Sequence, residues 1–163
     1  MAIQEAWSLE GIKRELSGFF ENKGFPIEFT KEDLLEEALT HSSYLNEHVG
    51  SKSNEKLAVL GDSVLDLAAS AYLYERSTSK GELTQRRSEL VNNKRLAKLA
   101  RQDSLDSYLR LSEGERKNRT KPQKIMSNAY EALIGLVLLN NDYDTAARFV
   151  RKAIIEPQVQ TAI

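Results

Sequence analysis

The chain has 163 residues, of which 40% are hydrophobic and 29% are charged, a size and composition that predict one globular domain over residues 1–163. It has no cysteine, which excludes disulfides and thiolate metal ligands, and no apolar run approaches the roughly 20 residues that span a bilayer, so we expect a cytoplasmic protein without a membrane partner. The net charge is −1, but residues 1–62 hold six Lys and Arg against twelve Asp and Glu, whereas residues 63–163 hold seventeen against twelve.

Helical periodicity dominates the first half of the chain. Apolar residues at positions 12, 16, 19 and 20 follow the spacing of one helix face, and the sequence NKGFP predicts where this helix ends. A second helix is expected to have Thr30 as its N-cap and Asp33 in its first turn. After a loop, the sequence predicts a long apolar helix from about Asn54 to Glu75.

The second half predicts further helices, separated by basic sequence. One helix is expected from about Glu82 to Arg101, and residues 113–124 are predicted to be a basic loop. An apolar helix, KIMSNAYEALIGLVLL, follows, and Asp144 is expected to cap a last helix that stops before Pro157. No alternating pattern typical of strands occurs, so the predicted fold class is all-α.

Basic residues concentrate in two of these segments. Residues 80–101 hold seven basic and two acidic residues, and residues 113–124 hold five and two. Lysine and arginine bind a polyanion well, because each neutralised phosphate releases counterions. One such segment is more often a solvated helix face, but two of them favour a nucleic-acid partner. The candidate contacts are Arg86, Arg87, Lys94, Arg116, Lys117, Arg119 and Lys121.

Carboxylates interrupt two of the apolar helices. Glu55 and Asp62 share one face of the long helix, and Asn128 and Glu131 are one turn apart on the later one. A buried carboxylate needs a partner, which can be a local amide, a basic side chain or a cation. Two acids that approach from different helices favour a cation. Oxygen ligands without cysteine or paired histidines favour Mg²⁺ or Mn²⁺.

Four stretches resemble motifs of the ribonuclease III family, and they occur in the family's order. NEKLAVLGDSVLDL at residues 54–67 is similar to the signature helix, and SNAYEALIGLVLL at 127–139 to the last acidic motif. LLEEALTHSSY and GELTQRRSELVNNKRLAKLA resemble two further motifs. The resemblance covers about residues 32–140 and implies a ribonuclease III-like helical endonuclease domain.

The resemblance also implies an activity and its ligands. Members of the family form two-fold dimers and hydrolyse double-stranded RNA with Mg²⁺ in RNA processing, leaving 5′-phosphate ends. The family's catalytic acids fall on Asp62 and Glu131, and an outer acid falls on Glu55, so the implied metal ligands are Asp62, Glu131, Asn128 and Glu55. Standard members continue into a double-stranded-RNA-binding domain, and we expect none within these residues.

Two positions depart from the family pattern. Ala58 stands where the family has a glutamate, and Asn128 stands where it has an aspartate. Alanine cannot bind a cation and asparagine offers only a neutral oxygen, so we expect weaker cation binding and a less favoured second metal. Mini-ribonuclease III, the small branch of the family, has alanine and a non-acidic residue at these positions and still cuts RNA.

A third departure concerns self-association. Val59 stands where the family usually has an aromatic residue that inserts into the partner subunit. A homodimer built around the long helix is still expected, with Val59 near the two-fold axis and roughly 1–2 kcal/mol less apolar burial. His41, in the stretch THSS, is interpreted as a structural histidine.

Three functions remain open on this sequence. The first is a metal-dependent endoribonuclease acting on double-stranded or structured RNA, with activity weakened by Ala58 and Asn128. The second is a catalytically silent relative that binds RNA or a ribonucleoprotein such as the ribosome. The third is a helical interaction module without an RNA role. Cleavage of duplex RNA with and without a chelator would distinguish them.

Overall fold

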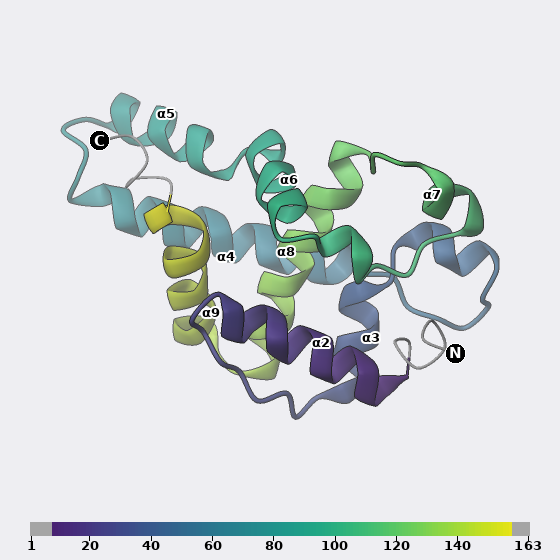
Figure 1. Ribbon diagram of the computed structural model, residues 1–163. Coiled ribbons are helices and arrows are strands. Elements are labelled where there is room, and N and C mark those ends of the chain that lie inside the picture. The colour runs from purple at the N-terminus through teal and green to yellow at the C-terminus, as the bar shows by residue number, and fades with distance from the viewer. Residues whose placement is uncertain (1–7, 158–163) are drawn as a thin grey trace.

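The computed structural model describes residues 8–157, which form an all-α domain as the sequence predicts (Figure 1). The only pairing of extended backbone within this range is an isolated parallel bridge between Thr40 and Arg110. The elements are α2 (Leu9–Asn22), α3 (Glu32–Leu39), η1 (Ser42–Asn46), α4 (Glu55–Tyr74), α5 (Lys80–Val91), α6 (Asn93–Gln102), η2 (Leu105–Ser107), α7 (Glu113–Lys117), α8 (Gln123–Asn140), α9 (Tyr143–Val150) and η3 (Arg151–Ile155).

The helices α4 and α8 form the centre of the domain. They pack against each other more extensively than any other two elements of the described chain. Thirteen of the 18 residues of α8 are buried, so this helix is covered on almost every side. Only eight of the 20 residues of α4 are buried, which leaves one face of that helix uncovered.

Two glycines permit the close crossing of α4 and α8. A Cβ atom on Gly61 would lie 2.6 Å from the carbonyl carbon of Glu131, and one on Gly135 would lie 2.9 Å from the carbonyl carbon of Leu57. In both cases it would lie closer still to the carbonyl oxygen. Any larger residue would therefore overlap with the backbone of the other helix. The crossing places Asp62, the residue after Gly61, beside Glu131.

The helix α4 would suffice by length and composition to cross a membrane, which the apolar runs of the sequence did not predict. No other helix among residues 8–157 meets the same criteria. A core helix of a soluble protein can meet them too. Here the buried face of α4 packs chiefly against α8.

The start of α3 differs from the prediction. The helix begins at Glu32, so the N-cap position falls on Lys31 and not on Thr30, and Lys31 makes no side-chain cap hydrogen bond. The Thr30 backbone N–H donates to the Oδ1 atom of Asn140 at 3.0 Å. This contact holds the segment before α3 against the end of α8. Asp33 does lie in the first turn, as predicted.

The last helices also differ from the prediction. Asp142, not Asp144, caps α9, since its Oδ1 atom accepts the N–H of Thr145 at 2.7 Å. Asp144 lies in the first turn instead, where a negative charge is favoured by the helix dipole. The helical conformation does not stop before Pro157, because η3 is a π-helical turn and residues 156–157 are still helical.

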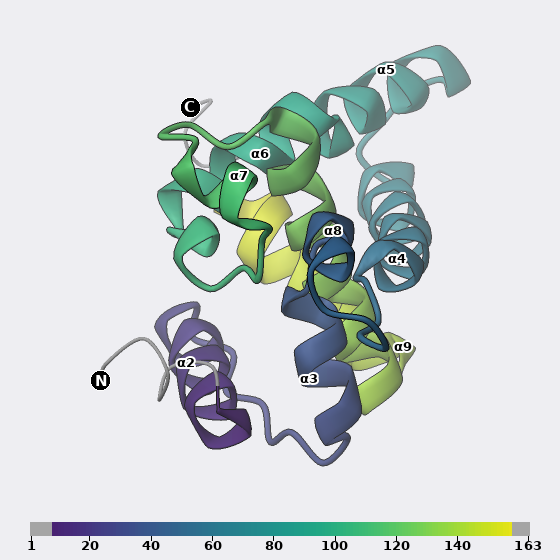
Figure 2. The same ribbon diagram turned by 90° about the vertical axis from the view of Figure 1, so that its right-hand side faces the viewer.

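The helix predicted from Glu82 to Arg101 is two helices, α5 and α6, which are separated at Asn92. The Oδ1 atom of Asn92 accepts the N–H of Arg95 at 2.9 Å, and its Nδ2 donates to the carbonyls of Ser88 and Glu89 at 3.1 and 3.0 Å. One side chain therefore ends α5 and begins α6, because an amide both donates and accepts. Figure 2 shows α5 projecting away from the rest of the domain.

The predicted basic loop 113–124 contains a short helix, α7. In both views α5, α6 and α7 lie along the upper side of the molecule, and α2, α3 and α9 lie along the lower side (Figures 1 and 2). Both basic segments therefore lie on the same side of the domain, which is also the side where α8 begins.

Candidate functional site

The structure brings the two predicted acids, Asp62 and Glu131, together at the crossing of α4 and α8. The backbone of Glu131 lies against Gly61, and the charge of Asp62 acts on the Glu131 carboxyl. Glu131 is buried, with 6% of its surface exposed. Asp62 is exposed, although its apolar neighbours in the sequence suggested a core position. The pair therefore consists of one buried and one accessible carboxylate.

The electrostatics of this pair favour a positive charge. Burial raises the pKa of Glu131 to about 7, and the negative charge of Asp62 adds to the rise. The pKa of Asp62 is raised as well, first by partial burial and then by the charge of Asp66. Lys124, in the first turn of α8, opposes the rise at both acids. One lysine does not restore the ordinary pKa of either acid, so the site remains short of positive charge.

Lys124 was not singled out from the sequence. Lys124, Asn128 and Glu131 are spaced by four and three residues, so they follow one face of α8. This spacing could have identified Lys124 as a neighbour of the acid pair. Lys124 is also the last residue of the basic segment 113–124, so its charge was counted as part of that segment.

The two departures from the family pattern lie close to the pair. Asn128 is half-buried one turn before Glu131, and Ala58 is buried one turn before Asp62. Among residues 8–157, no three His, Cys, Asp or Glu side chains gather where they could hold a metal ion. Mg²⁺ commonly keeps several waters and binds through one or two carboxylates. The donor set of Asp62, Glu131 and the Asn128 amide oxygen therefore fits one hard cation.

The structure does not place Glu55 with these donors. Glu55 is the first residue of α4, about 10 Å along the helix axis from Asp62. Its Oε2 atom accepts the hydroxyl of Ser53 at 3.4 Å, and its charge acts on His41. The charge of Glu55 is not among those that shift the pKa of Asp62 or Glu131. The geometry thus gives no support to Glu55 as a ligand of the same ion.

His41 has a local structural role. Its Nδ1 atom accepts the N–H of Ser43 at 3.2 Å and so caps η1. Burial lowers the pKa of His41, and the charges of Glu115 and Glu55 oppose this. A neutral histidine that accepts a backbone N–H matches the structural interpretation from the sequence.

A model of the ribonuclease-III-like family matches residues 31–158. The chain belongs to this family. It is 42% identical over 142 residues to ribonuclease 3 of Borreliella burgdorferi and 38% identical over 152 residues to ribonuclease 3 of Streptococcus pneumoniae. These matches cover 85% and 90% of this chain but only 57% and 65% of the two relatives. The chain therefore spans about three fifths of the length of the curated relatives it matches.

Solved structures agree with the family assignment. The nuclease domain of ribonuclease III from Campylobacter jejuni is 32% identical, with a TM-score of 0.72 over 85% of this chain and 97% of that one. This structure is described as showing structural flexibility in the region involved in dimer formation. A second structure of the same nuclease domain gives a TM-score of 0.71. The resemblance stated from the four motifs and the predicted fold are both confirmed.

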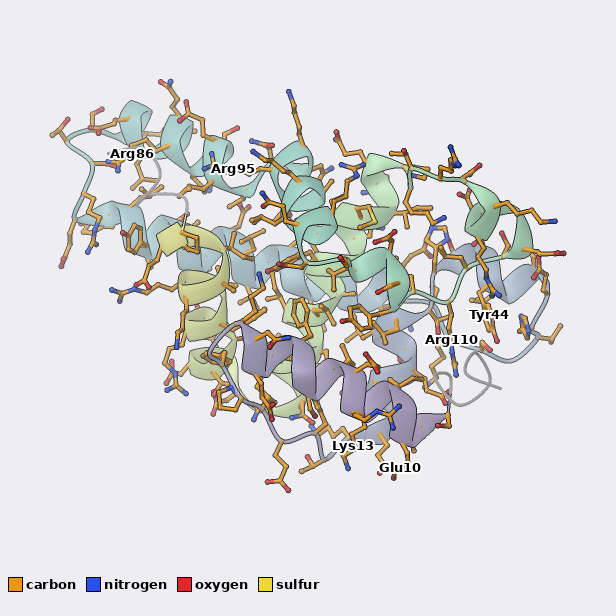
Figure 3. All side chains as sticks on the ribbon, in the orientation of Figure 1. Glu10, Lys13, Tyr44, Arg86, Arg95 and Arg110 are labelled. Atoms are coloured by element: carbon orange, nitrogen blue, oxygen red, sulfur yellow. The ribbon has the colours of Figure 1, made fainter. Side chains whose placement is uncertain are left out.

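Three predicted RNA contacts of this ribonuclease-III-like domain lie on α5 and α6. Arg86 donates to the carbonyl of Arg76 and lies 3.3 Å from the Glu82 carboxylate, and Arg87 lies 3.9 Å from the Asp66 carboxylate. Such partly exposed ion pairs contribute little to stability, so a phosphate could replace the carboxylate. The third contact, Lys94, is exposed in the first turn of α6. Figure 3 shows Arg86 and Arg95 toward the α5–α6 end of the domain and Tyr44 and Arg110 toward the other end.

Three further predicted contacts lie on α7 and just after it. Arg116, Lys117 and Arg119 are all exposed. Lys117 pairs with Glu113 at 3.2 Å on the surface, and Arg116 donates to the carbonyl of Leu111 at 3.4 Å. These side chains are accessible to a partner that approaches the upper side of the domain.

Lys121 differs from the prediction. Only 9% of its surface is exposed, and its Nζ atom donates to the carbonyls of Glu115, Arg116 and Asn118 at 2.9, 3.0 and 2.5 Å. An ammonium group has three N–H donors, and all three are used. Lys121 therefore cannot contact a phosphate in this conformation. A charge count along the sequence could not separate this internal lysine from its exposed neighbours.

The raised pKa of Glu131 predicts a stability that falls as pH rises in the metal-free domain. Its pKa is about 7 in the folded state against an ordinary 4.5, so the folded state binds more protons between these values. The stabilisation is complete at lower pH and is lost as pH rises through about 7, and we expect a loss of about 1–3 kcal/mol. Urea unfolding in chelator at about pH 5 and about pH 8 measures it.

The substitution Glu131→Gln should remove most of this pH dependence, because glutamine does not titrate. Glu21→Gln, at an exposed position on α2, is the matched control and should leave the dependence as in the wild type. Equal pH slopes for Glu131→Gln and the wild type would contradict the raised pKa.

Proposed function

We propose that this domain is a metal-dependent endoribonuclease that cuts double-stranded or structured RNA in RNA processing and leaves 5′-phosphate ends. The observation that carries the proposal is the acid pair at the α4–α8 crossing, where a buried Glu131 with a pKa of about 7 lies beside an accessible Asp62. A fold alone has no use for a buried carboxyl whose pKa is raised further by a neighbouring acid. Membership of the ribonuclease-III-like family and relatives named ribonuclease 3 support the same function.

Each residue of the site has a separate part in the proposed reaction. Asp62, Glu131 and the amide oxygen of Asn128 would hold Mg²⁺ or Mn²⁺. The bound ion would supply the positive charge that stabilises a phosphodiester under attack. Glu131 must lose its proton to bind the ion, so cation binding is linked to proton release. Asp62 is exposed, so the site is accessible from solvent through this residue. Lys124 would add a positive charge on the side where a phosphate would enter.

Ala58 and Asn128 set the expected strength of the site. With two carboxylates in place of four, the charge that attracts the ion is halved, and the affinity for Mg²⁺ falls accordingly. We therefore propose a nuclease that needs more Mg²⁺ than a site with the full family set. The same feature favours the second candidate, a catalytically silent relative that binds structured RNA, because no third acid among residues 8–157 lies where it could hold the same ion.

Cleavage of labelled duplex RNA tests the proposal. The wild type should cut with Mg²⁺ or Mn²⁺ and not with chelator, and Asp62→Asn and Glu131→Gln should each lower cleavage by at least about 100-fold. Glu21→Gln on α2 should cut like the wild type. A wild type that binds the duplex in low salt but never cuts above the chelator control supports the silent relative. A wild type that neither binds nor cuts leaves only an interaction module without an RNA role.

The outer face of α4 supports a further part of the proposal, a homodimer. Val59, Leu60, Leu67 and Tyr74 are all exposed large apolar residues of this helix, and Val59 and Leu67 expose 69% and 56% of their surface. Exposed large apolar side chains that recur along one helix are typical of an interaction site. The similar nuclease domain of Campylobacter jejuni is described with a region involved in dimer formation. We propose that two copies of this domain associate through α4, with Val59 near the two-fold axis.

A charge placed on this face should dissociate the dimer. Leu67→Glu would bury two like charges near the axis without a partner, so we expect mainly monomer at micromolar concentration. Light scattering measures the mass. Leu139→Glu, at a partly exposed leucine near the end of α8, is the matched control and should leave the wild-type mass. A dimer that survives Leu67→Glu would place the interface on another face.

A further inference from the structure

The segment between α7 and α8 is built around one buried lysine. The ammonium of Lys121 donates to three backbone carbonyls. One belongs to Arg116 in the last turn of α7, and another belongs to Asn118, the residue directly after α7. The third carbonyl is that of Glu115, also in α7. The C-terminal carbonyls of a helix lack intrahelical partners and carry partial negative charge, so a cation is favoured there. Lys121 thus closes the end of α7 from a position four residues further along the chain.

The backbone of the same residue is attached to α6. The carbonyl of Lys121 accepts the Nη2 group of Arg101 at 3.0 Å. Pro122 follows, and α8 begins at Gln123. One residue therefore joins the end of α6, the end of α7 and the start of α8. Its side chain and its backbone hold different elements.

The short α7 depends on such support. A helix of five residues is far below the length that is stable on its own. The remaining closure at its C-terminal end comes from Asn118, whose N–H donates to the Glu115 carbonyl at 3.2 Å and whose Nδ2 donates to the Glu115 carboxylate at 3.1 Å. Both contacts are local and exposed, so they contribute less than a buried charge with three acceptors.

The cations around Lys121 face outward while Lys121 does not. Lys117 and Arg119 are exposed on either side of Asn118, and Lys124 acts on Asp62 and Glu131 from the first turn of α8. These positions follow one another within eight residues, so the fold around Lys121 decides their spacing.

We propose that Lys121 is a positioning residue for RNA: its buried ammonium fixes the segment 113–122, so that Lys117 and Arg119 meet phosphates in register with the acid pair. This inference rests on the proposed function. Lys121 itself touches no RNA, because its three donors are spent inside the protein. Lys121 acts only through its exposed neighbours, so its contribution can be distinguished from theirs by experiment.

Amide hydrogen exchange of the free protein tests the structural half. Lys121→Met keeps the aliphatic stem and removes the charge, so the amides of residues 115–120 should exchange at least about tenfold faster, while those of α4 and α8 stay as in the wild type. Lys117→Met, an exposed lysine of the same segment, is the matched control and should leave this exchange unchanged. Lys121→Arg should not restore the wild type, because a planar guanidinium cannot meet three converging carbonyls as an ammonium does. Unchanged exchange in Lys121→Met overturns the inference.

A double-mutant cycle on duplex-RNA binding, measured in chelator so that no cleavage occurs, tests the functional half. Arg119→Gln in the wild type should weaken binding several-fold and lower the slope of log K against log salt by about one. Lys121→Met alone should weaken binding about tenfold. In the Lys121→Met background, Arg119→Gln should change little, because Arg119 is already misplaced. If the two residues acted independently, the fold-losses in binding of the single variants would multiply in the double variant. That result would overturn the positioning role.

The two failures can be told apart. A wild type that binds no duplex RNA in low salt overturns the proposed function and, with it, the RNA role of Lys121. A wild type that binds RNA, together with multiplied effects or unchanged exchange, overturns the role of Lys121 and leaves the proposed function intact.

Discussion

Replacing Gly135 with alanine should lower the free energy of unfolding by more than about 4 kcal/mol. The new Cβ would lie 2.9 and 3.1 Å from the carbonyl carbon and Cα of Leu57, and nearer still to its carbonyl oxygen. All three atoms belong to the backbone of α4, so no side chain can turn aside to make room. The two central helices would have to separate, and the core around them would lose its close packing. Urea unfolding followed by circular dichroism measures the change.

The matched control is the same substitution at Gly18. In the helix α2 a Cβ on Gly18 would meet nothing within 4 Å. Alanine is the better helix former, so Gly18→Ala should raise the free energy of unfolding by about 0.5–1 kcal/mol. The same glycine-to-alanine change should therefore lower the free energy of unfolding at Gly135 and raise it at Gly18. A loss below about 1 kcal/mol at Gly135 would mean that α4 and α8 cross with more room than the structure gives them.

Restoring the two missing acids should make the stability of the domain depend on a divalent cation. In the double variant Ala58→Glu with Asn128→Asp, four carboxylates lie around the α4–α8 crossing, where the pKa of Glu131 is already about 7. Ala58 is buried, so a glutamate at this position would be removed from solvent and placed close to other acids, which is unfavourable without a cation. We expect a destabilisation of about 2–4 kcal/mol in chelator. Mg²⁺ at about 100 times its dissociation constant should return about 2.7 kcal/mol.

Thermal unfolding with and without Mg²⁺ measures this effect, and the response should be several degrees larger than in the wild type. Cleavage at low Mg²⁺ should rise in the same variant if the wild type is a weakened nuclease. Ala71→Glu, at an exposed alanine of α4, is the matched control and should give no added response to Mg²⁺. A double variant that is as stable in chelator as in Mg²⁺ would show that the four side chains do not converge.

The elements with strong periodicity were predictable from the sequence. The apolar spacing of α2, α4 and α8 is long enough to identify a helix without any tertiary information. The approach of Asp62 to Glu131 was predictable because two acids in apolar helices need a common partner. The family resemblance then gave the pairing of the two helices. Burial could not be predicted at the single residue, since Asp62 lies on the uncovered side of α4 while Glu131 lies in the core.

The helix ends were less predictable, because competing caps differ by small energies. Asp142 and Asp144 are both suited to an N-cap, and only the direction of the chain leaving α8 decides between them. Thr30 lies one residue before the N-cap position of α3, and its backbone N–H donates to Asn140, a residue over 100 positions away that the local sequence does not reveal. Lys121 was misassigned for a similar reason. Its carbonyl acceptors come from a helix too short to show any periodicity.

The double cap at Asn92 has a mechanical consequence. Every hydrogen bond made by this side chain reaches a residue at most four positions away, so the bend between α5 and α6 is encoded locally in the sequence. The helix α5 has 12 residues and is about 18 Å long, and it packs against α4 more extensively than against α6, so the bend at Asn92 directs α5 along α4. The exposed pair of Arg87 and Asp66, at 3.9 Å, joins α5 to α4 at the surface, so any movement of α5 away from α4 would have to break it.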